Sequence, residues 1–205
     1  MHFEPNHIYH VYNRGNNKTP IFFNSENYLF LLRKVRKEWL AYCDIFCYCL
    51  MPTHFHFMLQ AKPGGCNTII LKERETHLQH LSKTIGKTLS SYTQAINIQN
   101  KTTGNLFQKK TKAKCLTDLP VDTSGFFATD YLLNCFHYIH LNPLTAGLVK
   151  NLRDWPYSSW PDYYGHRDGS LCNKEIVVKR LDVSIPDLTP PNDFVLNQKI
   201  IEGLW

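Results

Sequence analysis

Residues 50–60 read Leu50-Met51-Pro52-Thr53-His54-Phe55-His56-Phe57-Met58-Leu59-Gln60 and alternate strictly from Thr53 onward. Because successive side chains of a β-strand point to opposite faces, the two histidines would share one face and the two phenylalanines would pack against a core on the other. Pro52 is tolerated at the first residue of a strand, so the strand is expected to begin near Thr53. Two imidazoles on one pleat can bind one metal ion. The alternative is a half-buried strand with two incidental histidines, so a second element must supply the rest of a site.

The segments before this strand are expected to pair with it and to pack on it. His7 to Arg14 is rich in β-forming residues and ends at a Gly-Asn-Asn turn, which predicts a first strand. Glu26 to about Tyr42 has apolar residues at helical spacing and follows a capping Asn24 or Ser25. Asp44 to Leu50 predicts a second strand. Only two residues separate it from the histidine strand, so the two are expected to form an antiparallel pair.

The segments after the histidine strand complete the order of elements. Lys62 to Gly65 is expected to be a loop, and Lys72 to Ile98 carries an apolar stripe that predicts a long helix. Asn100 to Asn105 is expected to turn the chain into a strand over Leu106 to Leu116. Strand, helix, two strands, helix and strand is the order of a split βαβ unit. The predicted fold class is therefore α+β, a ferredoxin-like sandwich in which helices lie on an antiparallel sheet.

Length and composition predict a folded protein without membrane segments. The 205 residues are 43% hydrophobic and 13% aromatic, which is enough for a core and excludes a disordered chain. No apolar run approaches the ~20 residues of a membrane helix, and Met1 to Pro5 lacks the features of a signal peptide. Seven cysteines occur without a Cys-x-x-Cys pair, and Cys43, Cys47 and Cys49 are expected to be packing thiols. The expected location is a reducing cytoplasm.

Basic residues are concentrated in one part of the chain. The net charge is +6, and the segment from Thr76 to Thr117 contains no aspartate or glutamate. A basic segment of this length predicts a surface that binds nucleic-acid phosphates, and the alternative is a solvated lysine face. The candidate DNA-binding residues are Arg14, at the end of the first strand, and Lys83, Lys87, Lys109, Lys110, Lys112 and Lys114.

The segment from Tyr131 to Asn142 carries the second half of a candidate site. Its apolar residues recur at helical spacing after a loop over 118–128, and Pro143 is expected to end the helix at Asn142. Tyr138 and Asn142 are four residues apart and fall on one helix face. Tyrosine can attack phosphorus, and an amide oxygen is a hard ligand suited to magnesium or manganese.

Other side chains compete for these roles. Tyr92 lies on an apolar helix stripe and is expected to be a core residue. Tyr131 shares the face of Tyr138, but the residue four positions later is a cysteine, which is not a hard oxygen ligand. His137 and His140 point elsewhere on the helix and are expected to support the site or lie at the surface.

With these motifs the chain resembles the REP-associated tyrosine transposases, a branch of the HUH single-tyrosine transposases. The resemblance rests on Tyr9 to Gly15, Leu50 to His56, Gly104 to Gln108, Tyr138 to Pro143 and Trp155 to Ser159. It covers about residues 6 to 165. The expected organisation is therefore a transposase domain over residues 1–165 and a C-terminal extension over 166–205. Within that extension, 184–191 is expected to be a linker and 194–205 a short amphipathic helix.

The resemblance implies an HUH-type endonuclease and strand transferase that acts on single-stranded or hairpin DNA. Tyr138 would be the nucleophile, forming a 5′-phosphotyrosine and releasing a 3′-hydroxyl. His54, His56 and Asn142 would bind one divalent cation, Mg²⁺ or Mn²⁺, which polarises the scissile phosphate. A homodimer is compatible with this mechanism.

Two functional classes stay open at this point. The first is an active transposase or nickase, and the second is a catalytically retired or domesticated protein that binds hairpin DNA. The presence of His54, His56, Tyr138 and Asn142 together favours the first, because a retired enzyme has no chemical reason to keep all four. A zinc-binding structural protein is disfavoured, since too few soft ligands occur at metal-binding spacing.

Overall fold

The computed structural model describes residues 1–71, 74–117 and 128–188. Its main sheet has the strand order β2-β3-β1-β6, and all three neighbouring pairs are antiparallel. The strands are β1 (Ile8–Arg14), β2 (Cys43–Met51), β3 (His54–Ala61) and β6 (Lys112–Cys115). The histidine strand β3 is therefore central. This order and the antiparallel pairing confirm the predicted ferredoxin-like α+β fold.

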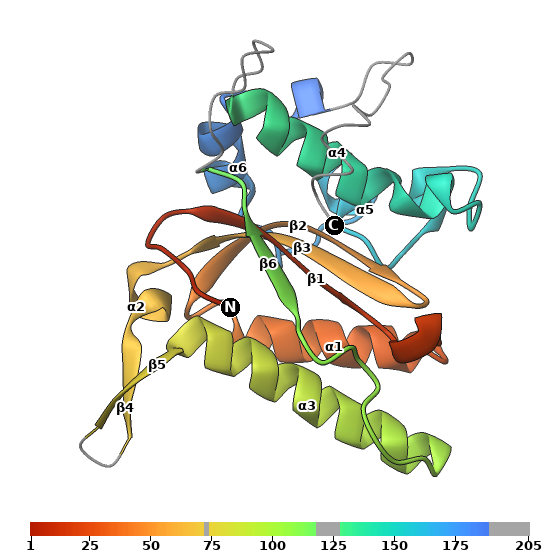
Figure 1. Ribbon diagram of the computed structural model, residues 1–205. Helices are drawn as coiled ribbons and strands as arrows, with labels where there is room; N and C mark the ends of the chain where they lie inside the picture. Colours follow the sequence, from red (N-terminus) through yellow and green to blue (C-terminus); the bar gives the residue numbers. More distant parts are fainter. Residues whose placement is uncertain (72–73, 118–127, 189–205) are drawn as a thin grey trace.

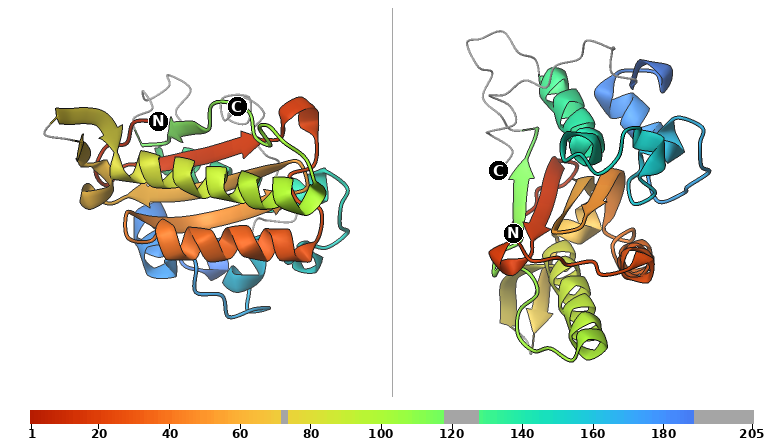
Figure 2. Two further views of the ribbon diagram at one scale, coloured as in Figure 1. Left: turned by 90° about the horizontal axis from the view of Figure 1, so that it is seen from below. Right: turned by 90° about the vertical axis from the view of Figure 1, so that its right-hand side faces the viewer.

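Helices cover both faces of this sheet (Figures 1 and 2). Two long helices lie on one face, α1 (Ser25–Glu38) and α3 (His80–Asn100), and α4 (Ala128–Thr145) lies on the other. The shorter elements are α2 (Pro63–Cys66), β4 (Thr68–Leu71), β5 (Arg74–Gln79), α5 (Trp160–Tyr163), α6 (Lys174–Leu181) and 3-10 turns at Asn16–Lys18, Leu152–Asp154 and Pro186–Leu188. Because helices cover both faces of the sheet, β3 is more deeply buried than the half-buried strand that its alternating sequence suggested.

Helix α1 begins as the sequence predicts and ends earlier. Asn24 caps it, because its side-chain oxygen accepts a hydrogen bond from the backbone N–H of Asn27 at 3.1 Å. The helix ends at Glu38 instead of continuing to Tyr42. Trp39 is fully buried, and its indole N–H donates to the hydroxyl of Thr88 on α3 at 3.0 Å. That contact ties the two helices together at the point where the chain turns into β2.

The long helix predicted from Lys72 starts later than expected. Residues 74–79 form strand β5, which pairs with β4, and α3 begins at His80. Leu78, which fits the apolar stripe of a longer helix, is 39% exposed. The prediction of a helix from Lys72 is wrong because Gln79 bonds to Phe3, a residue distant in the sequence. Its buried side-chain amide accepts from the backbone N–H of Phe3 at 2.7 Å and donates to the carbonyl of Phe3 at 2.8 Å.

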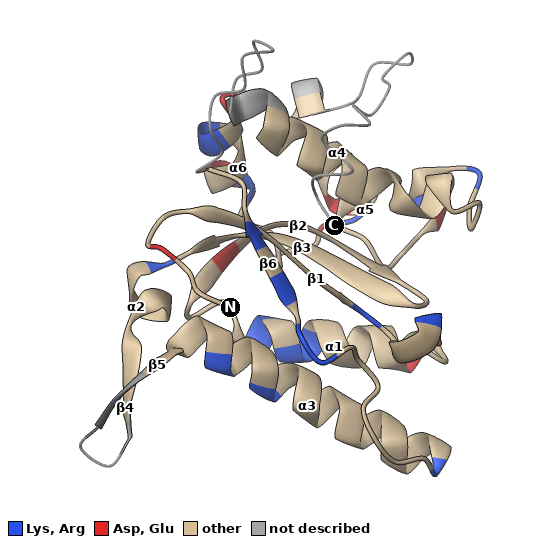
Figure 3. Ribbon diagram, in the orientation of Figure 1, with Lys and Arg blue, Asp and Glu red and all other residues tan. Residues whose placement is uncertain are grey.

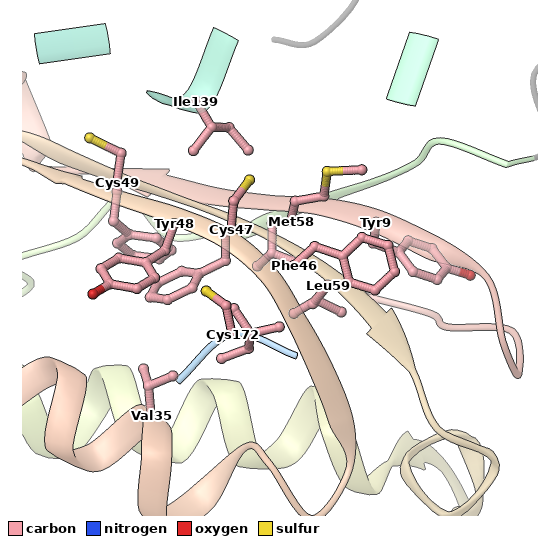
Figure 4. Packing of buried hydrophobic residues seen from close by; sticks show 14 of the residues in the cluster. Tyr9, Val35, Phe46, Cys47, Tyr48, Cys49, Met58, Leu59, Ile139 and Cys172 are labelled. Carbon is pink, nitrogen blue, oxygen red and sulfur yellow. The ribbon is translucent and has the colours of Figure 1, made fainter. Parts of the chain in front are cut away.

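Helix α4 packs its apolar stripe on the sheet and continues past Pro143. Ile139 is fully buried, and Figure 4 shows it above Cys47, Cys49 and Met58 of the sheet. The expected end at Asn142 is wrong, since the helix runs to Thr145 with the proline inside it. A proline this close to the end removes only one backbone hydrogen bond, which the packing of the helix can offset.

The strand predicted over Leu106–Leu116 is shorter. Only Lys112–Cys115 pairs with β1 as a strand, and Phe107 forms an isolated bridge with Gly15. Between these two points Asn13 donates its side-chain N–H groups to the carbonyl of Gln108 and to the hydroxyl of Thr111. The Asn13 side chain thus bonds residues 108–111 to β1, where regular strand pairing does not occur.

The segment after α4 covers the outer edge of β2. Backbone N–H groups of Leu50, Ser159 and Asn173 join β2 to residues 157–173 at 2.9 to 3.0 Å. Beyond the expected domain end at residue 165, buried apolar residues belong to the same core, namely Leu171, Cys172, Val177, Leu181 and Leu188. The carbonyl of Leu188 accepts from the hydroxyl of Tyr164, so the first part of the expected linker is docked. Residues 118–127 of the loop expected over 118–128 and the expected tail helix at 194–205 lie outside the described residues.

All seven cysteines are free thiols, and Cys43, Cys47 and Cys49 are buried, as expected for packing residues. Among the described helices, none is both long and apolar enough to cross a lipid bilayer.

Candidate histidine–tyrosine site between β3 and α4

The strand register gathers polar side chains on the sheet face that α4 covers. Residues directly opposite each other in antiparallel strands project on the same side. His56 is opposite Tyr12, and His54 is opposite Arg14. His10 is two residues before Tyr12 on β1 and therefore shares this face. The sheet thus presents an imidazole-rich surface beneath α4.

His56 is held deep in this surface. It is fully buried, and its Nδ1 lies 2.8 Å from Nε2 of His10. Burial, together with the neighbouring His10 and His54, lowers the pKa of His56 well below the usual range of an imidazole. The ring is therefore neutral near pH 7 and keeps an electron pair that can bind a metal ion.

His54 lies at the rim and is half-buried. Its Nδ1 is 3.0 Å from the hydroxyl of Thr53, and its ring centroid is 5.0 Å from that of His56, with the rings at 85°. Burial lowers the pKa of His54, a side-chain hydrogen bond with Asn142 opposes this shift, and the charge of Arg14 adds to it. The two imidazoles are thus close, neutral near pH 7 and held at different angles.

Helix α4 brings Tyr138 and Asn142 to these histidines. The side-chain N–H of Asn142 donates to the backbone carbonyl of Tyr138 at 2.7 Å. The Tyr138 ring is 8% exposed, and its centroid lies 5.6 Å from His56 and 6.3 Å from His10 in edge-on contacts. The structure therefore brings together all four residues singled out from the sequence, within one chain.

His10 is a site residue that sequence reasoning left without a role. It stands in the motif from Tyr9 to Gly15, and its position has the same parity as Arg14, so it shares the face of that residue. This shared face was the sequence signal that could have identified His10 as a site residue. The partner of His10 depends on the pairing of β1 with β3, which local sequence does not specify.

The competing tyrosines have other contacts. Tyr92 is fully buried, and its hydroxyl donates to the carbonyl of Ile21 at 2.6 Å, as expected for a core residue. Tyr131 lies on α4 with Nζ of Lys114 5.8 Å from its ring centroid, and burial raises its pKa to about 12. Tyr138 differs from both in that its ring lies against His56 and His10.

His137 and His140 are both 2% exposed, so a surface location is wrong for them. Nε2 of His140 lies 2.8 Å from the hydroxyl of Ser159, in the segment that covers the edge of β2. The ring of His140 also contacts Phe136 edge-on at 4.4 Å. These contacts make His140 part of the packing between α4 and the C-terminal segment.

The candidate DNA-binding residues are divided between two layers (Figure 3). Lys112 and Lys114 lie opposite Tyr12 and His10 across the β1–β6 pair, so they share the face of the histidines. Arg14 is exposed at the end of the same face. Lys109 and Lys110 are exposed in the loop before β6, whereas Lys83 and Lys87 are exposed on α3, on the opposite side of the sheet.

Within the described residues, no group of three or more His, Cys, Asp or Glu side chains could hold a metal ion. A metal at this site would therefore need a different third ligand, and the amide oxygen of Asn142 has the right chemistry for a hard divalent cation.

Comparison with known proteins finds a likeness to solved structures but not to known sequences. No protein-family model and no curated protein sequence matches the chain. Among solved structures, a REP-associated tyrosine transposase bound to a REP hairpin superposes with a TM-score of 0.58 at 16% sequence identity. The match covers 84% of this chain and 94% of the transposase chain. The two chains share one fold. The likeness extends to the antiparallel sheet and the helices that lie on it.

Proposed function

We propose that this protein cleaves and rejoins single-stranded DNA through a 5′-phosphotyrosine intermediate. The observation that supports the proposal most strongly is the convergence of two strand histidines with Tyr138 and Asn142 of a helix far along the chain. Each residue has an ordinary structural explanation when taken alone. A neutral histidine pair, an amide oxygen and a phenol within one small site are together suited to phosphoryl transfer.

The residues present fit a divalent cation. His54 and His56 would supply imidazole nitrogens, and Asn142 would supply its side-chain oxygen. Imidazole is a better ligand for manganese than for magnesium, so this mixed donor set favours Mn²⁺ while still admitting Mg²⁺. Such an ion, when bound, polarises the scissile phosphate.

Tyr138 is the proposed nucleophile. Its oxygen would attack phosphorus, the bond from phosphorus to the 3′ oxygen would break, and the 3′ oxygen would leave as a hydroxyl after taking a proton. The 5′ end would remain joined to Tyr138, and attack by a 3′-hydroxyl would reverse these steps and join two strands. The ordinary phenol pKa of about 10 makes the hydroxyl a weak nucleophile at pH 7, so the site must assist its deprotonation.

Basic residues on the same face are the proposed DNA contacts near the reaction. Arg14 lies beside His54, and Lys112 and Lys114 lie beside Tyr12 and His10. Such side chains would bind backbone phosphates and position a strand without reading its sequence. The similar solved structure carries a REP hairpin, which supports hairpin DNA as one form of the substrate.

The test is cleavage of labelled single-stranded oligonucleotides in the presence of Mn²⁺ or Mg²⁺. Sequences that flank the protein's own gene, with and without a hairpin, are the first substrates. We expect nicking by the parent protein and strong loss of nicking in His54→Ala. His56→Asn is the better second variant, because truncating a fully buried side chain to alanine would also leave a cavity.

The alternative is a DNA-binding protein that has retired the chemistry. It predicts hairpin binding that is equal in the parent and in both histidine variants, with no nicking by any of them. That result would exclude the proposed reaction and retain only DNA binding.

A further inference from the structure

His10 makes a close contact with the proposed ligand His56. It is fully buried on β1, and its Nε2 lies 2.8 Å from Nδ1 of His56. The two rings are 5.0 Å apart between centroids and tilted by only 18°, so the contact lies nearly within both ring planes. Tyr12 stacks on His10 at 4.7 Å, and Tyr138 contacts it edge-on at 6.3 Å. The aromatic neighbours thus restrict the orientation of the His10 ring.

The chemistry of imidazole indicates which of the two rings donates the hydrogen bond and which accepts it. A neutral imidazole carries one proton, and a metal ion binds the nitrogen that lacks it. Nδ1 of His56 is engaged by His10, so Nε2 is the nitrogen that could bind a cation. The proton of His56 must then be on Nδ1 and be donated to His10. Nε2 of His10 can accept it only if His10 carries its own proton on Nδ1.

We infer that His10 is a positioning residue for metal binding, which accepts a hydrogen bond from Nδ1–H of His56 and fixes the tautomer that presents Nε2 to a divalent cation. The inference rests on the metal site proposed above. His54 has an analogous arrangement, since its Nδ1 lies 3.0 Å from the hydroxyl of Thr53. A polar group behind each imidazole would therefore orient both ligands in the same way. Such supporting hydrogen bonds typically strengthen metal affinity by about 10- to 100-fold.

Calorimetric titration with Mn²⁺ tests this role in the metal-free protein. His10→Phe keeps a ring in the space but removes the acceptor, and we expect it to weaken Mn²⁺ binding by about 10- to 100-fold. His10→Gln carries an amide oxygen near the position of Nε2, and it should restore most of the affinity. His80→Phe is a matched control, because His80 stacks on Tyr42 at 5.5 Å at the start of α3, and its Mn²⁺ affinity should equal that of the parent.

A second measurement reads the tautomer directly and needs no variant. Long-range ¹⁵N NMR of the parent with saturating Mg²⁺ should show the ring protons of both His10 and His56 on Nδ1. Protonation of His56 at Nε2 would overturn the inference, and so would parent-like Mn²⁺ affinity in His10→Phe. If instead the parent binds Mn²⁺ no more tightly than His54→Ala, the proposed metal site itself is wrong, and the role of His10 is lost with it.

Discussion

Nδ2 of Asn142 lies 2.7 Å from the backbone oxygen of Tyr138, so the amide donates to the residue one helical turn earlier. Because the nitrogen is engaged in this way, the oxygen is the atom of the amide that can accept from His54 or bind a cation. One turn of α4 thus sets the candidate ligand oxygen and the candidate nucleophile relative to each other.

Removing the Asn142 amide should weaken both metal binding and cleavage, because it takes away the candidate ligand oxygen next to Tyr138. We expect Asn142→Ala to weaken Mn²⁺ binding by about 10-fold or more and to reduce cleavage by a similar or larger factor. Asn97→Ala is a matched control, since Asn97 on α3 also donates its amide to a backbone carbonyl, that of Gly104, at 2.9 Å. Calorimetry and single-turnover cleavage measure the two effects. Equal Mn²⁺ affinity in both variants would contradict a ligand role for Asn142.

Tyr138→Phe should abolish cleavage and leave DNA binding within about two-fold of the parent, because the change removes the nucleophilic hydroxyl and keeps the ring. The ring contacts with His56 and His10 do not need the hydroxyl, so the melting temperature should change little. Tyr131→Phe, on the same helix, should cleave normally. Trapping the protein on labelled DNA and mapping the adduct by peptide mass gives the direct measurement. An adduct on Tyr131 or Tyr92, or one that persists in Tyr138→Phe, would refute the assignment.

The salt dependence of DNA binding should show whether the lysines on the histidine face of the sheet contact DNA more than the lysines on α3 do. Each phosphate contact to single-stranded DNA contributes about 0.7 to the slope of log affinity against log salt. Lys112→Ala with Lys114→Ala should therefore reduce the slope by about 1.4 if both residues contact the strand. Lys83→Ala with Lys87→Ala changes the charge by the same amount on the opposite side of the sheet, and we expect a smaller reduction. Fluorescence anisotropy between low and high salt measures both slopes, and equal reductions would mean that DNA contacts both layers.

The buried histidines of α4 should make the fold sensitive to acid. Burial lowers the pKa of His137 to about 4 and that of His140 to about 3, below the ordinary value of about 6.5. Between pH 6.5 and about 4 the unfolded chain binds protons that the folded chain does not. The free energy of unfolding should therefore fall as pH falls through this window, by up to about 1.4 kcal/mol per pH unit for each histidine, and be fully regained above pH 7.

Urea unfolding followed by circular dichroism between pH 4.5 and 8 measures this dependence. His140→Gln removes one titrating group and keeps an atom near Nε2 for the contact with Ser159, so its unfolding free energy should vary less steeply with pH. A parental slope in His140→Gln would show that this residue does not contribute.

Local sequence was sufficient for the features that depend on side-chain parity and spacing. The alternation from Thr53 to Gln60 predicted the strand that carries both histidines, because the two faces of a strand follow from backbone geometry alone. The four-residue spacing of Tyr138 and Asn142 likewise predicted a shared helix face. The order of elements was enough to predict the ferredoxin-like sheet, since short connections and strand patterns restrict its topology.

Tertiary structure decided the features that depend on distant contacts. Gln79 bonds to the backbone of Phe3, and this contact places a β-hairpin where local periodicity predicts helix. Pairing of β1 with β3 brings His10 to His56, and packing of α4 on the same sheet face adds Tyr138. The physical reason is that hydrogen-bond partners and buried neighbours are set by which elements pack together. The sequence alone thus singled out the candidate site residues, and the packing of α4 on β3 decided that they meet.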